Sequence, residues 1–176
     1  MFDVKNRVCV ARRAFQTVTA ARGKLGAMAR PVTYAAYLAQ EAASDTKHEY
    51  LAGAVFAMAG GTPEHARLQA NTIGTLLAAL RGRPCAVFSS DLRVRIEATD
   101  RTTYPDVTVV CGAMETSKVD PHAVTNPTLL VEVTSESTEA DDRGDKFAHY
   151  RHIPSLREYV LARRAFRPIS TFACST

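Results

Sequence analysis

Two short apolar runs, residues 104–110 and 129–135, each contain a single acidic side chain. Both runs are rich in β-branched residues and are bounded by turn signals, which predicts a buried β-strand for each of them. A carboxylate inside such a strand is costly unless it is paired with a cation or binds a metal ion. Asp106 and Glu132 therefore predict a hard-cation site on neighbouring strands, and Lys146 follows on a predicted helix.

The order of the predicted elements along the chain is typical of a mixed α/β fold. The predicted helices cover residues 34–42, 63–80 and 138–152. The predicted strands form a hairpin at 49–58 and single strands at 85–88, 92–96, 104–110, 129–135 and 157–161. We therefore expect one domain with a central mixed β-sheet flanked by helices.

The net charge of +4 is unevenly distributed along the 176 residues. Residues 1–30 contain seven Lys or Arg and one acidic residue, and residues 162–176 contain three Arg and no acid. The central part is consequently acidic, so the basic pI does not indicate a nucleic-acid-binding surface on the fold itself. We predict a basic extension at 1–27, one domain at 28–161 and an atypical basic tail at 162–176. We hypothesise that this C-terminus is frameshifted or truncated.

The sequence contains no pattern that is typical of a membrane-spanning segment. No apolar stretch approaches the ~20 residues that a membrane-spanning helix needs. The N-terminal segment also lacks a continuous apolar run of the signal-peptide type. These features predict a cytoplasmic protein without a membrane partner.

The four cysteines form no CxxC pair and no zinc-binding spacing. Cys85 and Cys111 lie beside apolar runs, where a thiol behaves as a small hydrophobic group. We therefore expect both to be core residues and expect no disulfide framework.

Each of the three candidate site residues also has a purely structural interpretation. Asp106 could be a turn aspartate at the entrance of its strand. Glu132 lies in a run with no other charge; a structural ion pair with an arginine is the alternative to the ligand or acid–base role that we favour for it. Lys146 lies four residues after Asp142, a spacing that alone predicts an exposed helical ion pair. It becomes a site candidate because its helix directly follows the Glu132 strand.

Several short motifs occur in a fixed order between residues 34 and 161, which is about three quarters of the chain. They are HEYLAG at 48–53, GGTPEH at 60–65, SDLRV at 90–94, YPDV at 104–107, NP at 126–127, LVEV at 130–133 with Ser135, DRGDKF at 142–147 and YR at 150–151. In this order and spacing, the region resembles the restriction endonuclease family called Uma-two, within the PD-(D/E)xK nuclease superfamily.

The resemblance implies a restriction-endonuclease-like core that binds Mg²⁺, or Mn²⁺ in its place, through Asp106 and Glu132. In the superfamily the lysine normally lies two residues after the second acid, a position that Thr134 occupies here. The family moves this lysine to the following helix, which would be Lys146. Three further positions are implied to contribute metal ligands or contacts that support them: Glu49, His65 and Asp91.

On this resemblance we predict a Mg²⁺-dependent endonuclease that hydrolyses the phosphodiester bonds of DNA. Mg²⁺ prefers oxygen ligands and polarises phosphoryl oxygens, and Lys146 would assist the nucleophile. Because cutting a duplex needs two active sites, we also expect a homodimer. Two alternatives stay open: a non-catalytic nucleic-acid- or protein-binding module on the same fold, and an inactive truncated member of the family.

DNA affinity depends largely on contacts with phosphates, so an acidic domain needs local basic positions. The basic N-terminal segment is one candidate for these contacts. Five arginines of the domain are the others: Arg67, Arg81, Arg83, Arg93 and Arg95.

Overall fold

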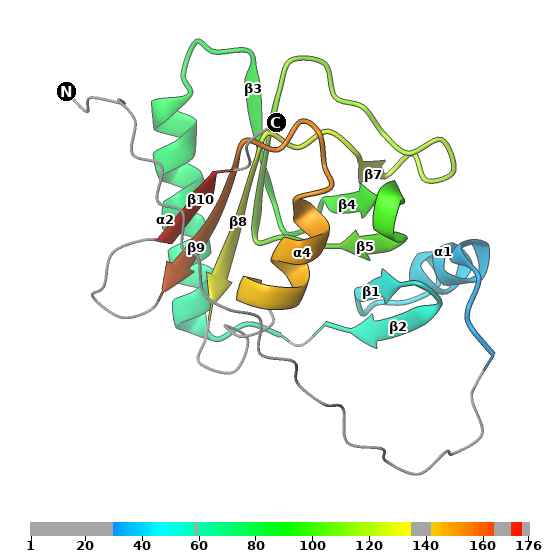
Figure 1. Cartoon of the computed structure of the whole chain (residues 1–176). Helices are drawn as coiled ribbons and strands as arrows, with labels where there is room; N and C mark the ends of the chain where they lie inside the picture. The colour runs from blue at the N-terminus through cyan, green and yellow to red at the C-terminus, as the bar shows by residue number, and fades with distance from the viewer. Residues whose placement is uncertain (1–29, 59, 135–141, 164–169, 174–176) are drawn as a thin grey trace, which may run out of the picture. The chain divides into compact units, whose positions relative to one another are not determined.

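Two five-stranded mixed sheets organise the fold of this protein in the computed structural model (Figure 1). The structure describes residues 30–58, 60–134, 142–163 and 170–173. The contacts divide the chain after Arg30, and the predicted extension at residues 1–27 lies outside the described residues. The predicted mixed α/β class is confirmed, and the division into two sheets is an addition to that prediction.

The first sheet, called sheet A below, has the strand order β2-β1-β5-β4-β7. Its strands are β1 (His48–Leu51), β2 (Ala54–Ala57), β4 (Arg93–Ile96), β5 (Arg101–Thr103) and β7 (Ala123–Val124). All neighbours are antiparallel except β4 and β7. The predicted hairpin turns at Ala52 and Gly53, which both have positive φ, and a Cβ at Gly53 would lie 2.6 Å from the Cβ of Pro31. This turn therefore requires glycine.

The second sheet, called sheet B below, has the order β10-β9-β8-β6-β3 and contains both acidic runs. Its strands are β3 (Cys85–Ser89), β6 (Val107–Cys111), β8 (Leu129–Thr134), β9 (Glu158–Arg163) and β10 (Ser170–Ala173). Only β8 and β9 are parallel, and the helical segment between them makes the crossover that parallel neighbours need. The sequence predicted neither β10 nor the extension of β9 to Arg163.

Two longer helices and three short helical elements connect the strands in the described part of the chain. The helix α1 (Tyr34–Ala42) begins at Thr33, whose hydroxyl accepts a hydrogen bond from the Ala36 amide. The helix α2 (Pro63–Ala79) begins at Thr62 in the same way. The 3₁₀ turn η1 (Glu97–Thr99) joins β4 to β5, and the π-helical turn η2 (Asp142–Lys146) leads into α4 (Phe147–Tyr150). The predicted helix at 138–152 is thus described only from residue 142 onward.

The strand β8 separates two hydrophobic clusters, because successive side chains point to opposite faces of a sheet. On one face, Val131 and Val133 pack with α2 residues such as Leu68 and Leu76. On the other face, Leu130 packs with Tyr150, Tyr159 and other buried residues of the larger cluster. Figure 1 shows α2 and α4 on the two sides of sheet B. Glu132 shares its face with Leu130 and therefore points toward α4.

The expectation that Cys85 and Cys111 are free core residues was wrong. Cys85 and Cys111 are direct partners in the register of β3 and β6, and they form a disulfide. Twenty-six positions separate them in the sequence, so no local spacing pattern could have revealed the pair. Sheet pairing alone brings the two sulfur atoms together.

None of the helices in the described residues is long and apolar enough to cross a membrane.

Candidate active site

Glu132 is buried within β8, and its carboxylate contacts Tyr150 and Lys146 on the segment that follows. The Tyr150 hydroxyl donates to Oε1 over 2.8 Å, and Lys146 Nζ lies 3.3 Å from the same oxygen. The Glu132 side chain is only 5% exposed, so a carboxylate here needs such partners. Tyr150 comes four residues after Lys146, and the helical turn therefore presents both groups to one strand residue.

Burial makes the Tyr150 hydroxyl a lasting hydrogen-bond donor to Glu132. Its fully buried position, together with the carboxylates of Glu132 and Glu49, raises the pKa of this phenol well above its usual value. The hydroxyl therefore keeps its proton and acts as a permanent donor to Glu132.

Lys146 also connects Glu132 to sheet A. Its Nζ lies 3.6 Å from Oε1 of Glu49, which comes from β1. The Thr103 hydroxyl on the neighbouring strand β5 donates to the same Glu49 oxygen. The ammonium thus stands between two carboxylates that belong to different sheets, and its side chain is 14% exposed.

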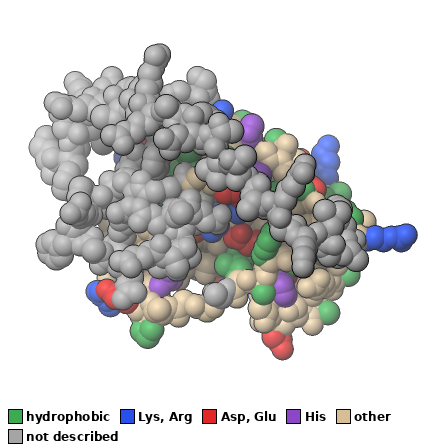
Figure 2. Space-filling view, turned by 60° about the horizontal axis from the view of Figure 1, so that its bottom comes forward, with side chains coloured by type: hydrophobic (Ala, Val, Ile, Leu, Met, Phe, Trp, Pro, Cys, Tyr) green, Lys and Arg blue, Asp and Glu red, His purple; other side chains and the backbone are tan. Residues whose placement is uncertain are grey.

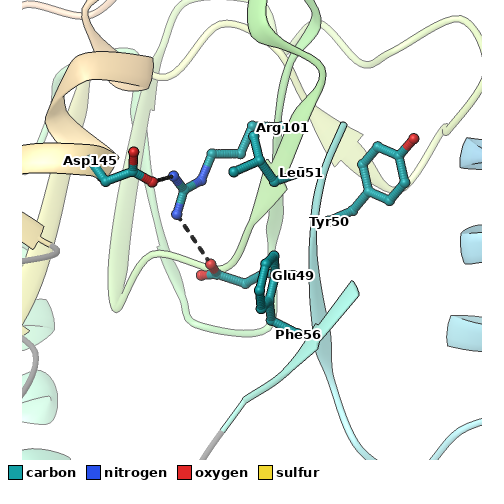
Figure 3. Close-up of a pocket in the computed structure, with 6 residues that line it drawn as sticks. All are labelled: Glu49, Tyr50, Leu51, Phe56, Arg101 and Asp145. Atoms are coloured by element: carbon teal, nitrogen blue, oxygen red, sulfur yellow. Dashed lines mark hydrogen bonds and ion pairs between the residues drawn. The ribbon is translucent and has the colours of Figure 1, made fainter. Parts of the chain in front are cut away.

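Arg101 and Asp145 continue this charged group on its other side. Arg101 Nη2 lies 3.4 Å from Oε2 of Glu49, and Nη1 donates to Asp145 Oδ2 over 2.8 Å (Figure 3). These residues line a pocket of about 220 Å³ together with Tyr50, Leu51 and Phe56. Figure 2 views the molecule from the side that lies at the bottom of Figure 1 and shows acidic side chains beside apolar ones.

Asp106 precedes β6 and is held from the opposite face of sheet B. Its Oδ2 accepts a 2.6 Å hydrogen bond from the Val133 amide, and its Oδ1 lies 2.8 Å from Nε2 of His65. Gln69, one turn after His65 on α2, donates to the Asp106 carbonyl oxygen over 2.7 Å. The backbone and the side chain of Asp106 are therefore both fixed.

The bond between His65 and Asp106 determines which imidazole nitrogen carries a proton. An ionised carboxylate only accepts hydrogen bonds, so Nε2 of His65 must be the donor. A protonated nitrogen has no lone pair for a metal ion. His65 thus orients Asp106 through this nitrogen, and its role as a metal ligand stays a prediction.

The two carboxylates of the sequence prediction lie at neighbouring strands, β6 and β8. Val107 pairs with Val131 in the register of β6 and β8, which brings Asp106 beside Glu132 on the neighbouring strand. The amide that binds Asp106 belongs to Val133, the residue directly after Glu132. A chain of contacts therefore links the candidate residues. His65 contacts Asp106, and Asp106 binds the amide next to Glu132. Glu132 contacts Lys146, and Lys146 contacts Glu49.

This donor set fits a divalent cation only in part. Among the described residues, no three His, Cys, Asp or Glu side chains are arranged so that they alone could hold a metal ion. Mg²⁺ typically takes one or two carboxylates and fills its other positions with water and substrate phosphate. The ammonium of Lys146 already lies between Glu49 and Glu132 and offsets part of their negative charge. Oxygen ligands from Asp106 and Glu132 therefore agree with Mg²⁺ chemistry.

Asp91 lies outside this group in the described part of the chain. Its carboxylate is 82% exposed and pairs with Lys47, and it also accepts from the Ser89 hydroxyl. The hydrogen bond with Lys47 lowers the pKa of Asp91 below its usual value. No hydrogen bond or ion pair links Asp91 to the other candidate residues among those described.

Two of the five arginines suggested for a DNA groove have little exposed side-chain surface and are engaged in ion pairs. Arg93 lies 3.3 Å from Asp120, and Arg95 pairs with Asp100 over 2.5 Å while its guanidinium covers the ring of Tyr34. These side chains are no more than 14% exposed. That part of the prediction was wrong because alternation along a strand does not distinguish a buried ion pair from an exposed charge.

Four contributors to the site were not predicted from the sequence: Gln69, Arg101, Thr103 and Tyr150. Tyr150 was detectable, because it shares a helical stripe with Lys146. Arg101 and Thr103 had no local signal, since they reach Glu49 only through the pairing of β5 with β1.

Comparisons with known proteins agree with this geometry. Residues 34–173 match the model of the Uma2 family, described as "Putative restriction endonuclease". This chain belongs to the Uma2 family. The confirmed resemblance covers both carboxylate strands and Lys146.

Two curated relatives, both uncharacterized proteins of Synechocystis sp. (strain ATCC 27184 / PCC 6803 / Kazusa), extend the comparison. One is 39% identical over 71% of this chain and 65% of its own length, and the other is 36% identical over 74% and 73%. The chain thus spans just under two thirds of the first relative.

A solved structure shows the same fold. A chain from Anabaena variabilis ATCC 29413, described as a putative nuclease belonging to DUF820, matches with a TM-score of 0.56 at 14% identity. The match covers 74% of this Uma2 chain and 78% of the other chain.

Proposed function

We propose that this Uma2 protein is a metal-dependent endonuclease that hydrolyses phosphodiester bonds of DNA. Family membership supports a nuclease in general terms. The observation that supports the specific proposal is the hydrogen bond from the Val133 amide to Asp106, which joins this carboxylate to the residue directly after Glu132, and Glu132 in turn contacts Lys146.

Asp106 and Glu132 would hold the divalent ion, with Mg²⁺ as the cofactor and Mn²⁺ as a substitute. When bound there, the ion would polarise a phosphoryl oxygen and lower the pKa of water. The protein's own residues prepare this site in advance. His65 and the Val133 amide fix Asp106, and the Tyr150 hydroxyl fixes Glu132, so neither carboxylate has to reorganise when substrate arrives.

Lys146 would act on the attacking water and on the developing negative charge. Its Nζ is 3.3 Å from Glu132, so it lies within reach of a water or phosphate oxygen bound beside that carboxylate. Glu49 holds the ammonium from the other side. Cleavage of both strands of a duplex would need two such sites, which is the basis for proposing a homodimer on duplex DNA.

A plasmid-nicking assay tests this function. Supercoiled plasmid is incubated with Mg²⁺ or Mn²⁺ and with wild type, Asp106→Asn or Glu132→Gln, which are close to isosteric. We expect metal-dependent nicking by wild type and a loss of at least ~10²-fold in both variants, the scale of one preorganised electrostatic group. Circular dichroism must show that all three proteins are folded. Equal nicking by the three proteins would contradict the proposal.

Metal binding gives a second, activity-independent readout. Mg²⁺ should raise the thermal midpoint of wild type more than that of either variant, because a ligand of the folded state stabilises it.

A non-catalytic binding module is the second candidate, and one observation favours it. The Lys146 ammonium already neutralises part of the charge of Glu49 and Glu132. DNA binding that survives in all three proteins, without metal-dependent nicking in any of them, would select this function.

A further inference from the structure

Phe56 is an aromatic side chain that stays exposed beside the candidate active site. It lies on β2, the edge strand of sheet A, and 53% of its surface is exposed. Its register partner on β1 is Glu49, so both side chains lie on the same face of the sheet. Figure 3 shows the Phe56 ring next to the Glu49 carboxylate.

The pocket beside Phe56 combines an aromatic surface with charged hydrogen-bonding groups. Its other lining residues include Arg101, Asp145 and Leu51. Asp145 is 56% exposed, whereas the Arg101 side chain is 6% exposed and is held between Asp145 and Glu49. The polar groups are therefore fixed around one open apolar ring.

Glu49 connects this pocket to the proposed cleavage centre. Glu49 lines the pocket, and its Oε1 lies 3.6 Å from Lys146 Nζ, which in turn contacts Glu132. A nucleotide whose phosphate lies at Glu132 and Lys146 would thus have its own or an adjacent base within reach of Phe56.

The charges that line the pocket favour the base of a nucleotide over its phosphate. Glu49 and Asp145 contribute two carboxylates against the one guanidinium of Arg101, so a phosphate would be repelled. A neutral base suits it better, because an aromatic ring stacks on the face of a base. The carboxylates can accept hydrogen bonds from exocyclic amino groups.

We propose that this pocket binds an unpaired nucleobase next to the scissile phosphate, with Phe56 as the stacking surface. The inference rests on the proposed nuclease function and specifies its substrate class. A base inside an intact duplex is stacked and paired and must first be extruded, which costs free energy. The protein therefore prefers single-stranded, mismatched or frayed DNA over a fully paired duplex.

Binding of an oligonucleotide that contains 2-aminopurine tests the stacking directly. The measurement is made in EDTA with single-stranded and fully paired oligonucleotides of the same sequence, so binding is read without cleavage. Phe56→Ala should weaken single-strand binding roughly 5- to 150-fold, the range that corresponds to one base–aromatic stack. Phe56→Tyr should restore binding and the fluorescence change. Met114→Ala is the matched control, because Met114 is also 53% exposed and lies outside the pocket.

The outcomes separate this inference from the proposed function. Wild-type cleavage with no difference among Phe56→Ala, Met114→Ala and wild type in binding overturns the base pocket and leaves the nuclease standing. Phe56-dependent single-strand binding without cleavage supports the pocket and contradicts the nuclease. Equal affinity of wild type for single-stranded and paired DNA also overturns the inference.

Discussion

Sheet A pairs its buried arginines with carboxylates, whereas Asp106 beside sheet B is held by a backbone amide and a histidine. In sheet A, Arg93 contacts Asp120, and Asp120 also accepts from the Tyr34 hydroxyl. Among the described residues Asp106 has no lysine or arginine partner. The comparison separates two uses of buried charge. The ions of sheet A neutralise one another, whereas Asp106 is the carboxylate that we propose for binding an external cation.

Glu49 and Lys146 lie at the boundary between these two regions. Glu49 belongs to sheet A by its strand, yet it contacts the ammonium that binds Glu132. We therefore expect changes in the sheet A pairs to affect the free energy of unfolding, and changes around Glu132 to affect activity first. Four substitutions test whether stability and activity depend on these two regions separately.

The largest effect is expected for Lys146→Met, which removes the ammonium between Glu49 and Glu132. The rate of single-turnover DNA cleavage should fall by about 10²–10⁴-fold, the usual contribution of a positioned acid–base group. Lys146→Arg is the control, since it keeps the charge and the ion pairs but not the amine. A Lys146→Met protein that is folded and cleaves at the wild-type rate would remove Lys146 from the site.

Arg93→Met should destabilise the fold without a specific effect on activity. Asp120 would keep a buried charge without its cation, because its side chain is 2% exposed. Breaking such a pair costs about 3–5 kcal/mol in the free energy of unfolding, which urea denaturation measures. The double variant Arg93→Met with Asp120→Asn should recover part of this loss. If Arg93→Met is as stable as wild type, the sheet A pairs are not structural in the sense proposed here.

Tyr150→Phe tests how the Glu132 carboxylate is supported. Loss of the 2.8 Å hydrogen bond should cost about 1–3 kcal/mol of stability, because a buried carboxylate loses one of its donors. Metal affinity should fall about 10- to 100-fold, as is typical when a group that supports a ligand is lost. Isothermal titration with Mn²⁺ measures the affinity, and Tyr159→Phe serves as a control on a neighbouring buried tyrosine. Unchanged affinity would show that Tyr150 only packs.

The smallest effect is expected for Asp91→Asn, since Asp91 is exposed and pairs with Lys47. An exposed pair contributes up to ~1 kcal/mol, and cleavage should be unchanged. The lowered pKa of Asp91 sets the sign: the stabilisation is present above the ordinary carboxyl pKa and is lost as the pH falls through the lowered value. Thermal melts of both proteins between pH 2 and pH 7 measure this difference. A large loss of cleavage would instead support Asp91 as a ligand.

Much of the fold followed from local patterns in the sequence. The strands around Asp106 and Glu132 were recognisable because short β-branched runs report burial. The hairpin turn at Ala52 and Gly53 was recognisable because its backbone needs positive φ. The disulfide of Cys85 and Cys111, the strand β10 and the second sheet were not, because each depends on a pairing partner distant in the sequence.

The sequence by itself determined which residues of this Uma2 protein are candidates for the chemistry. A lone carboxylate in a buried run, such as Glu132, is detectable wherever it lies, because its desolvation cost is a local property. Only the tertiary structure decided its partners. Glu49 reaches Lys146, and His65 reaches Asp106, through the order and register of strands and through helices on opposite faces of sheet B. Such contacts depend on how distant segments pack, and no periodicity in one segment contains that information.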